Sequence, residues 1–347
     1  IPPVFYEVLV KRIIELGGRP FLTDTNTVYS LSRYEGIGHY ITAWRNGYAL
    51  HHLGAPFIVA DGLVGIDATK VEIEGDVLKE VFVPSAIYQS DVLISVDHTT
   101  FHPYFGIGGN VKNLGMGGVA KQTKIQIHRH EIPVFLKEKC KGCEKCVLVC
   151  PSEAIAIVNH KSVMDPSLCW GCKLCIDVCQ NEAIVVEHFN YEQNYKALAD
   201  GAMGVLKRFE GKFLAVNLLL DITLDCDCPD EQGRPVLPDL GVMVSKDIVA
   251  IDKASLDMIR STPRYPLSVV DQPGAHSADL VNLSHDPARF GMDEMLKYME
   301  QKGRGYCDYE LIKLPRRKAP FKERAKFIPE MGYARRLHER VKKVGVV

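Results

Sequence analysis

The sequence has no apolar run long enough to cross a membrane. Such a helix needs about 18 or more consecutive apolar residues, and the buried-looking segment Phe213–Leu220 is far shorter. The chain also lacks an excess of charge of one sign, since 42 Lys and Arg balance 43 Asp and Glu. With 46% hydrophobic and 24% charged residues, it has the composition of a globular protein of about two domains, not of a disordered or fibrous one.

Several sequence signals are missing as well. The chain begins at Ile1 and not with Met, so the true N-terminus is either missing or processed, and the lack of a basic and apolar leader is only suggestive. It contains neither a GxGxxG nor a Walker motif, so nucleotide binding is not indicated. The charge that is present is uneven, with eleven Lys and Arg against three Glu from Pro315 onward. The acidic remainder argues against nucleic-acid binding throughout the chain.

The basic tail has three interpretations. It could be a solvated helix, a docking surface for an acidic partner, or a nucleic-acid patch. The first two are favoured because the tail has no regularly interleaved aromatic residues on which bases would stack.

Hydrophobic periodicity predicts alternating helices and strands on both sides of a cysteine-rich segment. Helices are expected at 4–16, 40–53, 195–209, 252–259 (with Asp252 as its cap) and 290–301. Strands are expected at 20–22, 57–60, 80–83, 91–96, 213–220, 241–251 and 309–314. The glycine-dense segment 105–118 is expected to be an irregular loop. This order predicts an α/β fold with a mostly parallel sheet that continues across the cysteine-rich segment.

Eight of the eleven cysteines lie within forty residues. They form two copies of the pattern CxxCxxCxxxC, which repeat with a period of 29 residues and each continue into Glu-Ala-Ile. A duplication of this kind inside a larger chain defines a small inserted module. The predicted domains are an α/β body in two parts, 1–134 and 190–314, an insert at 135–189, and a basic tail at 315–347.

The cysteine spacing predicts two [4Fe–4S] clusters in a small α+β domain of the bacterial ferredoxin type. Three cysteines separated by two residues bind one cluster, and the fourth reaches the other cluster in two-cluster ferredoxins. The first cluster is therefore expected on Cys140, Cys143, Cys146 and Cys179, and the second on Cys169, Cys172, Cys175 and Cys150. Pro151 follows Cys150 as this pattern expects, whereas Gln180 follows Cys179.

Two other uses of these cysteines are less favoured. Zinc sites use isolated CxxC pairs and would leave the third cysteine of each run unused. A disulfide framework needs an oxidising compartment, for which nothing in the sequence argues. Thiolate-bound clusters and the unpaired Cys226, Cys228 and Cys307 would fit a reducing, cytoplasmic compartment. Two roles remain possible for Cys226 and Cys228: a metal or redox pair, or a turn that contains two buried thiols. The metal interpretation is the weaker one because a single intervening residue is too few for ordinary zinc spacing.

Short motifs outside the insert carry a resemblance to a known family. They are Thr23–Tyr29, Ala60–Gly62, His98, His102, Gly106–Gly117, Cys226–Cys228, Pro238-Asp239 and Ser245–Asp252. Together with the cysteine module, they resemble the widespread prokaryotic family named domain of unknown function 362, up to about Leu314. That family has no settled activity, so the resemblance implies an architecture and not a reaction. Its members usually carry a further N-terminal segment with His-Phe-Gly-Glu, and often a lysine where Thr100 stands here.

The glycine-rich segment is also similar to that of lactate racemase and its relatives. In those enzymes a histidine precedes a glycine-rich loop, and a lysine shortly after paired glycines holds a nickel-pincer nucleotide. Lys112, which follows Gly108 and Gly109, is the matching position. The likeness ranks Lys112 as a candidate site residue and implies a racemase-like, non-redox enzyme as one alternative.

A second site is expected outside the carboxyl ends of the predicted strands, where ligands bind in open parallel α/β sheets. The Asp24–Thr27 segment, Asp61-Gly62 and Asp97-His98 follow strands there and could meet the glycine-rich segment. Backbone N–H groups and a lysine at that point would favour an anionic ligand. The candidate cofactor-binding residues are Asp24, Asn26, Gly108, Gly109 and Asn113, and the candidate catalytic residues are His98, His102 and Lys112.

Each of these residues also has a structural interpretation. Asp24 and Asn26 are common caps of turns. His98 and His102 could be metal ligands, acid–base groups or hydrogen-bonded structural histidines. Lys112 is harder to explain structurally, because a buried lysine must be paired or have a shifted pKa.

The leading hypothesis is a cytoplasmic iron–sulfur oxidoreductase. It would pass single electrons from two clusters to an anionic ligand or cofactor in the α/β body, with a redox protein as partner and a small anionic substrate. The alternatives are a non-catalytic electron carrier or docking subunit, and the racemase-like enzyme. An enclosed polar cleft with Lys112 and a histidine would favour an enzyme, and a flat surface a carrier.

Overall fold

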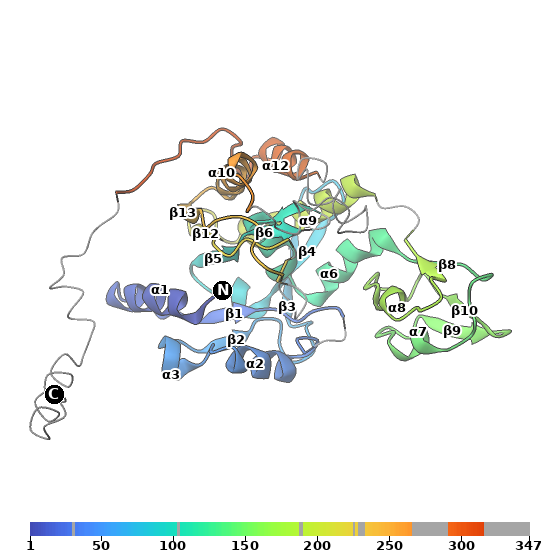
Figure 1. Cartoon of the computed structure of the whole chain (residues 1–347). Helices are drawn as coiled ribbons and strands as arrows, with labels where there is room; N and C mark the ends of the chain where they lie inside the picture. Colours follow the sequence, from blue (N-terminus) through green and yellow to red (C-terminus); the bar gives the residue numbers. More distant parts are fainter. Residues whose placement is uncertain are drawn as a thin grey trace, which may run out of the picture. The chain divides into compact units, whose positions relative to one another are not determined.

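The computed structural model describes residues 1–29, 32–102, 105–186, 190–224, 226–227, 233–265 and 291–315. These residues form a mixed α/β structure of helices and several small sheets (Figure 1). Ile1–Tyr309 is one compact unit, and a second begins at Glu310. No helix among the described residues is long and apolar enough to span a membrane. Cys228 and nearly all of the basic tail lie outside the described residues.

The N-terminal segment follows the sequence expectation closely. Its elements are α1 (Pro3–Glu15), β1 (Leu22–Asp24), α2 (Gly36–Arg45), α3 (Leu50–Leu53) and β2 (Phe57–Val59). β1 pairs with β2 in parallel, with Leu22 opposite Phe57. The single helix predicted at 40–53 is two helices, α2 and α3. Gly47 separates them with a φ of 86°, a left-handed conformation that ends an α-helix.

The main core of the body surrounds a helix buried on nearly all sides. This helix, α9 (Tyr191–Lys207), packs against β4, α12, α6 and the glycine-rich segment. The other elements of this region are β3 (Ala68–Glu72), β4 (Glu80–Pro84), α4 (Ser85–Tyr88), β5 (Leu93–His98), β12 (Phe213–Leu219), β13 (Gly241–Ser245), α10 (Ile248–Ser261) and α12 (Met292–Gln301). Small residues along α9 allow its neighbours to approach closely; a Cβ on Gly204 would lie 2.4 Å from the Cβ of Val81.

The sheets are small and mixed, so the continuous, mostly parallel sheet is not confirmed. β12 lies between β5, its parallel neighbour, and β13, its antiparallel neighbour. Among the described residues, only β1–β2 and β5–β12 pair in parallel, and the other ladders are antiparallel. Several predicted strands are only two or three residues long, too short to join neighbouring sheets. The segment 309–314, predicted as a strand, has no regular structure, and its apolar side chains are exposed.

The glycine-rich segment is ordered, which corrects the expectation of an irregular loop. It consists of β7 (Gly106–Gly108), α5 (Asn110–Lys112) and the π-helical turn η1 (Asn113–Gly117). β6 (Thr100–His102) pairs with β7, and α6 (Lys121–His128) and the 3-10 turn η2 (Arg129–Glu131) follow the segment. Its glycines allow close packing, since a Cβ on Gly115 would lie 2.2 Å from the Leu198 carbonyl oxygen of α9. The glycine pattern therefore reflects helix packing rather than chain flexibility.

Asp252 does not begin a helix, contrary to the sequence prediction. The N-cap of α10 is Asp247, whose carboxylate accepts hydrogen bonds from Val249 N at 2.8 Å and Ala250 N at 3.0 Å. Asp252 is instead fully buried inside α10. It accepts hydrogen bonds from the backbone N–H groups of Asn110 and Val111, both at 2.8 Å, and so caps α5. Capping across elements that are distant in sequence cannot be found by local pattern.

Candidate functional site

The two cysteine motifs adopt the same backbone conformation. Left-handed φ angles occur at three equivalent pairs of positions, 29 residues apart: Gly142 and Gly171 (67° and 69°), Glu144 and Lys173 (both 64°), and Glu153 and Glu182 (53° and 48°). The helices α7 (Lys145–Leu148) and α8 (Leu174–Asp177) start at equivalent positions too. Left-handed conformations cost a non-glycine residue about 1–3 kcal/mol and persist only where the surroundings impose them. The sequence duplication is thus also a structural duplication.

Two antiparallel ladders hold these motifs, and one of them is a hairpin. β8 (Val134–Phe135) pairs with β11 (Ile184–Val185), and β9 (Ile155–Val158) pairs with β10 (Lys161–Met164). The first ladder joins the two ends of the cysteine-rich segment.

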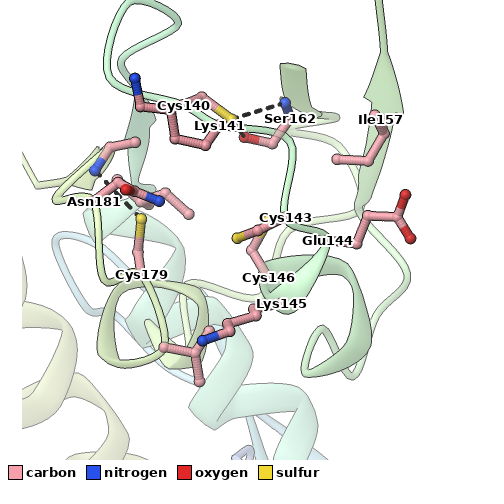
Figure 2. Close-up of a pocket in the computed structure, with 13 residues that line it drawn as sticks. Cys140, Lys141, Cys143, Glu144, Lys145, Cys146, Ile157, Ser162, Cys179 and Asn181 are labelled. Carbon is pink, nitrogen blue, oxygen red and sulfur yellow. Dashed lines mark hydrogen bonds between the residues drawn. The ribbon is translucent and has the colours of Figure 1, made fainter. Parts of the chain in front are cut away.

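Four cysteines line one pocket, to which both motifs contribute. They are Cys140, Cys143, Cys146 and Cys179, and Figure 2 shows their side chains around a common hollow. Two sulfur atoms accept backbone hydrogen bonds, Cys140 Sγ from Ser162 N at 3.4 Å and Cys179 Sγ from Ala183 N at 3.3 Å. N–H donors aimed at sulfur stabilise the thiolate form, which is the form that binds metal.

The remaining four cysteines of the segment line a second pocket. They are Cys150, Cys169, Cys172 and Cys175. Here too sulfur atoms accept backbone hydrogen bonds, Cys169 Sγ from Gly171 N at 3.4 Å and Cys150 Sγ from Ala154 N at 3.3 Å. Each pocket thus combines three cysteines of one motif with the last cysteine of the other. This is the grouping that the sequence spacing predicts.

Hydrogen bonding and burial shift the pKa values of the cysteine thiols in opposite directions. The side-chain hydrogen bond of Ser162 lowers the pKa of Cys140, whereas burial raises the pKa of Cys146, Cys169 and Cys172. Burial also raises the pKa of Cys175 to about 12. Metal binding to such thiols would release protons, because the ligand is the thiolate. A cysteine-rich segment of this kind is compatible with an iron–sulfur protein. Among the residues that the structure describes, no group of three or more His, Cys, Asp or Glu is arranged to hold a single metal ion.

In the body, the end of β1 carries a buried polar cluster. Lys124 of α6 donates from Nζ to Thr25 Oγ1 and to the Asn26 carbonyl, both at 2.6 Å. Asn26 Nδ2 donates to Asp61 Oδ1 at 2.8 Å, so these groups form one network. Burial lowers the pKa of Lys124 to about 8 and raises the pKa of Asp61. Asn26 thus bridges a lysine and a carboxylate.

Asp24 lies beside this network. Burial favours its neutral form, but the hydrogen bond and charge of His39, together with the charges of Arg33 and Lys124, lower its pKa to about 2. The His39 Nε2 and Arg33 Nη1 atoms lie 3.5 and 3.8 Å from Asp24 Oδ2. The Asp24 carboxylate is thus ionised at neutral pH, with Arg33 and His39 within 4 Å.

His98 is held on both ring nitrogens. Its Nδ1 lies 2.8 Å from Asp227 Oδ2, and its Nε2 lies 2.7 Å from the Leu220 carbonyl oxygen. A carbonyl oxygen and a carboxylate can only accept, so both nitrogens donate and the ring is an imidazolium. Burial lowers its pKa, but the bond and charge of Asp227 outweigh burial and the net pKa is raised. In this arrangement His98 anchors the Cys226-Asp227 turn and has no nitrogen left to accept a proton.

His102 and Lys112 lie near one another in the glycine-rich segment. His102 is buried, with its ring 5.1 Å from that of Phe105. Burial and the charges of Lys112 and Lys173 keep the pKa of His102 well below its usual value, so this ring is neutral. The side chain of Lys112 folds back along Gly108, where an added Cβ would lie 3.9 Å from its Nζ.

The structure brings some of the predicted site residues together. Thr25 Oγ1 donates to the Gly117 carbonyl at 2.5 Å, so the end of β1 meets the glycine-rich segment as expected. Lys112 and His98 both act electrostatically on Asp97, whose pKa burial and the Asp252 charge raise to about 8. The other two candidates make structural contacts. Asn113 Nδ2 donates to Ser95 Oγ at 3.1 Å, and Gly109 packs against the Asp252 carboxylate.

Sequence reasoning missed Lys124 as a member of this region. Lys124 stands in a polar stretch of α6 and resembles a solvated helix residue until the packing buries it. Asp97, which the sequence places at this site together with His98, lies at the end of β5 and is buried.

Comparison with protein-family models matches residues 1–257 to the family described as Domain of unknown function (DUF362). A search of curated proteins gives no match. The family match extends from the first residue through the cysteine-rich segment and into α10. Because it covers well over half of the 347 residues, the chain belongs to the DUF362 family.

Proposed function

We propose that this protein binds two [4Fe–4S] clusters and is a cytoplasmic oxidoreductase that passes single electrons to an anionic ligand or cofactor in its α/β body. The observation that carries the proposal is the arrangement of eight cysteines in two pockets, each with three ligands from one motif and one from the other. That arrangement is characteristic of two-cluster ferredoxins. A redox protein would be the external partner.

The residues of the insert support this chemistry. When bound, [4Fe–4S] clusters supply one-electron transfer at low potential. Backbone N–H groups point at Cys140, Cys150, Cys169 and Cys179, which stabilises thiolate charge. Hydrogen bonds to the sulfur atoms also tune reduction potentials. A reducing compartment would preserve the clusters, which is the reason for proposing the cytoplasm.

In the body, the residues best suited to an anionic ligand are cations on the glycine-rich segment and α6. Lys112 supplies a primary amine. Lys124 has a pKa of about 8, close enough to neutral pH for it to exchange a proton. His98 would act as a positioning residue because both of its nitrogens are occupied. His102, buried and neutral, could exchange a proton only with a neighbour inside the protein.

The first test is chemical analysis of protein purified without oxygen. We expect about eight iron and eight acid-labile sulfide atoms per chain, as for two four-iron clusters. Cys179→Ser should alter the cluster held by Cys140, Cys143 and Cys146, with little effect on the signal of the other. Four or fewer iron atoms in fully reconstituted protein would contradict the two-cluster assignment.

The second test addresses the body. Lys112→Ala should leave iron content unchanged because Lys112 lies outside the cysteine-rich segment. It should weaken binding of an anionic ligand by about 1.5–3 kcal/mol, the value of a charge-assisted hydrogen bond. Mass spectrometry of small molecules released from protein purified without oxygen would identify the ligand. Unchanged ligand content in the variant, with a lower melting temperature, would assign Lys112 a structural role.

A non-catalytic electron carrier is the second candidate. The observation that favours it is the full hydrogen bonding of His98, which removes one candidate acid–base group from the body. A carrier would release no small molecule in the same mass-spectrometric measurement, and would still exchange electrons reversibly.

A further inference from the structure

We infer that the second cluster, on Cys150, Cys169, Cys172 and Cys175, is the one coupled to the α/β body, and that the first cluster is the entry point for an external electron carrier. The inference rests on the proposed function and adds a direction to it. It comes from the different surroundings of two motifs that are otherwise alike.

The clearest difference lies at the equivalent glycines of the two motifs. A Cβ on Gly171 would lie 2.1 Å from the carbonyl oxygen of His128, at the end of α6 in the body. A Cβ on Gly142 would lie 2.5 Å from the carbonyl oxygen of His160, in the turn between β9 and β10 of the insert itself. The second motif therefore packs directly on the body backbone, and the first packs on its own module.

Further contacts of the second motif lead into the body. Pro133, which precedes the insert strands, lines the second pocket. Arg129 of η2 donates to the Ser167 carbonyl at 3.3 Å, and its positive charge acts on the Cys169 thiol. Lys173, between two ligands of the second pocket, acts electrostatically on His102 and His128. The first pocket, by contrast, is lined by residues between 140 and 184 alone.

The first motif is the more open of the two. Cys143 is exposed, whereas its equivalent, Cys172, is only partly so. Leu148, on α7, is 84% exposed, and the equivalent position on α8 is Asp177. An exposed leucine in the same motif as an exposed ligand would give an incoming carrier an apolar contact on the first motif.

The electron path follows from this arrangement. A reduced external carrier would give one electron to the first cluster and be oxidised by it. The first cluster would be reoxidised as it reduces the second, whose pocket adjoins α6 at Gly171 and whose Lys173 acts on His102. The second cluster would be reoxidised in turn by the ligand or cofactor proposed in the body, which would take up the electron.

The test uses two charge-removing variants and measures reduction potentials by EPR-monitored titration. Arg129→Gln removes a charged body side chain that donates to the Ser167 carbonyl, two residues before Cys169, and Lys161→Gln removes a charged insert side chain that donates to the Cys140 carbonyl at 2.7 Å. Losing a positive charge disfavours adding an electron, so each change should lower the potential of the nearby cluster. We expect Arg129→Gln to shift the second cluster only, and Lys161→Gln the first only.

Signals are assigned with Cys143→Ser for the first cluster and Cys172→Ser for the second. Arg129→Lys, which keeps the charge, should retain the native potentials. The inference is overturned if Arg129→Gln shifts the first cluster, or shifts neither while Lys161→Gln lowers the first. Reconstituted protein without clusters would overturn the proposed function itself, a different result from unchanged potentials.

Discussion

The buried carboxylate of Asp252 provides a quantitative test of how the glycine-rich segment is held. It accepts hydrogen bonds from Asn110 N and Val111 N at 2.8 Å and from Asn217 Nδ2 at 3.0 Å. Asp252→Ala would leave three buried N–H donors without this acceptor, at about 1–1.5 kcal/mol each. Alanine returns about 0.6 kcal/mol through its higher helix propensity. The expected loss of stability is therefore about 2.5–4 kcal/mol.

The matched control is Asp257→Ala in the same helix. Asp257 pairs with Lys253 at 2.5 Å near the surface, and an ion pair of this kind contributes at most about 1 kcal/mol. The propensity gain is the same for both variants, so their difference isolates the buried hydrogen bonds. Circular dichroism melts of both variants, at equal iron content, should show the Asp252→Ala protein unfolding roughly 5–10 °C below the control. Equal melting temperatures would refute the role of Asp252 as the anchor of α5.

Two further predictions concern other contacts. The pKa of His98 is raised and that of Asp227 is lowered in the folded protein. Charged His98 therefore contributes its full stabilisation of the folded state below the pKa that the histidine has in the unfolded chain, about 6.5. This contribution is lost as the pH rises through the higher pKa of the folded state. Melting temperatures across this range should fall with pH in the native protein more than in His98→Gln, and parallel curves would contradict the imidazolium assignment. Gly115→Ala should cost about 2–3 kcal/mol, because its Cβ would force the glycine-rich segment away from α9. Gly233→Ala, where nothing lies within 4 Å of the added Cβ, is the control in the same denaturation assay and should be near neutral.

The parts that the sequence predicted well are those with strong local signals. The cysteine grouping follows from a spacing rule, and strands such as β12 follow from a run that is apolar except at Asn217. The positions of β1, β2, β4 and β5 were also predicted to within a few residues. Each of these signals lies within about ten residues of the feature that it specifies, so no knowledge of tertiary packing was needed.

The errors arose where distant segments determine the structure. Gly115 and Gly201 allow η1 and α9 to pack closely. The local sequence around Gly115, by contrast, predicts an irregular loop. Asp252 caps a helix 142 residues away from it in the chain. The burial of Lys124 and the double hydrogen bonding of His98 likewise depend on packing between elements far apart in sequence. Sequence reasoning therefore identified a polar region near β1 and the glycines but could not assign its charge pairs.

The short ladder between β8 and β11 has a consequence for how this architecture could arise and be altered. Val134 and Phe135 lie opposite Val185 and Ile184, so the chain enters and leaves the cysteine-rich module at neighbouring positions, about 5 Å apart. The module also lies between β5 and β12, which pair in parallel although it separates them in sequence. The module therefore closes on itself at this ladder, so that its insertion costs the body little loop-closure entropy. A tight turn could span the same gap. We expect a body with the module excised at this ladder to keep its fold and to lose the eight cysteines of the two pockets.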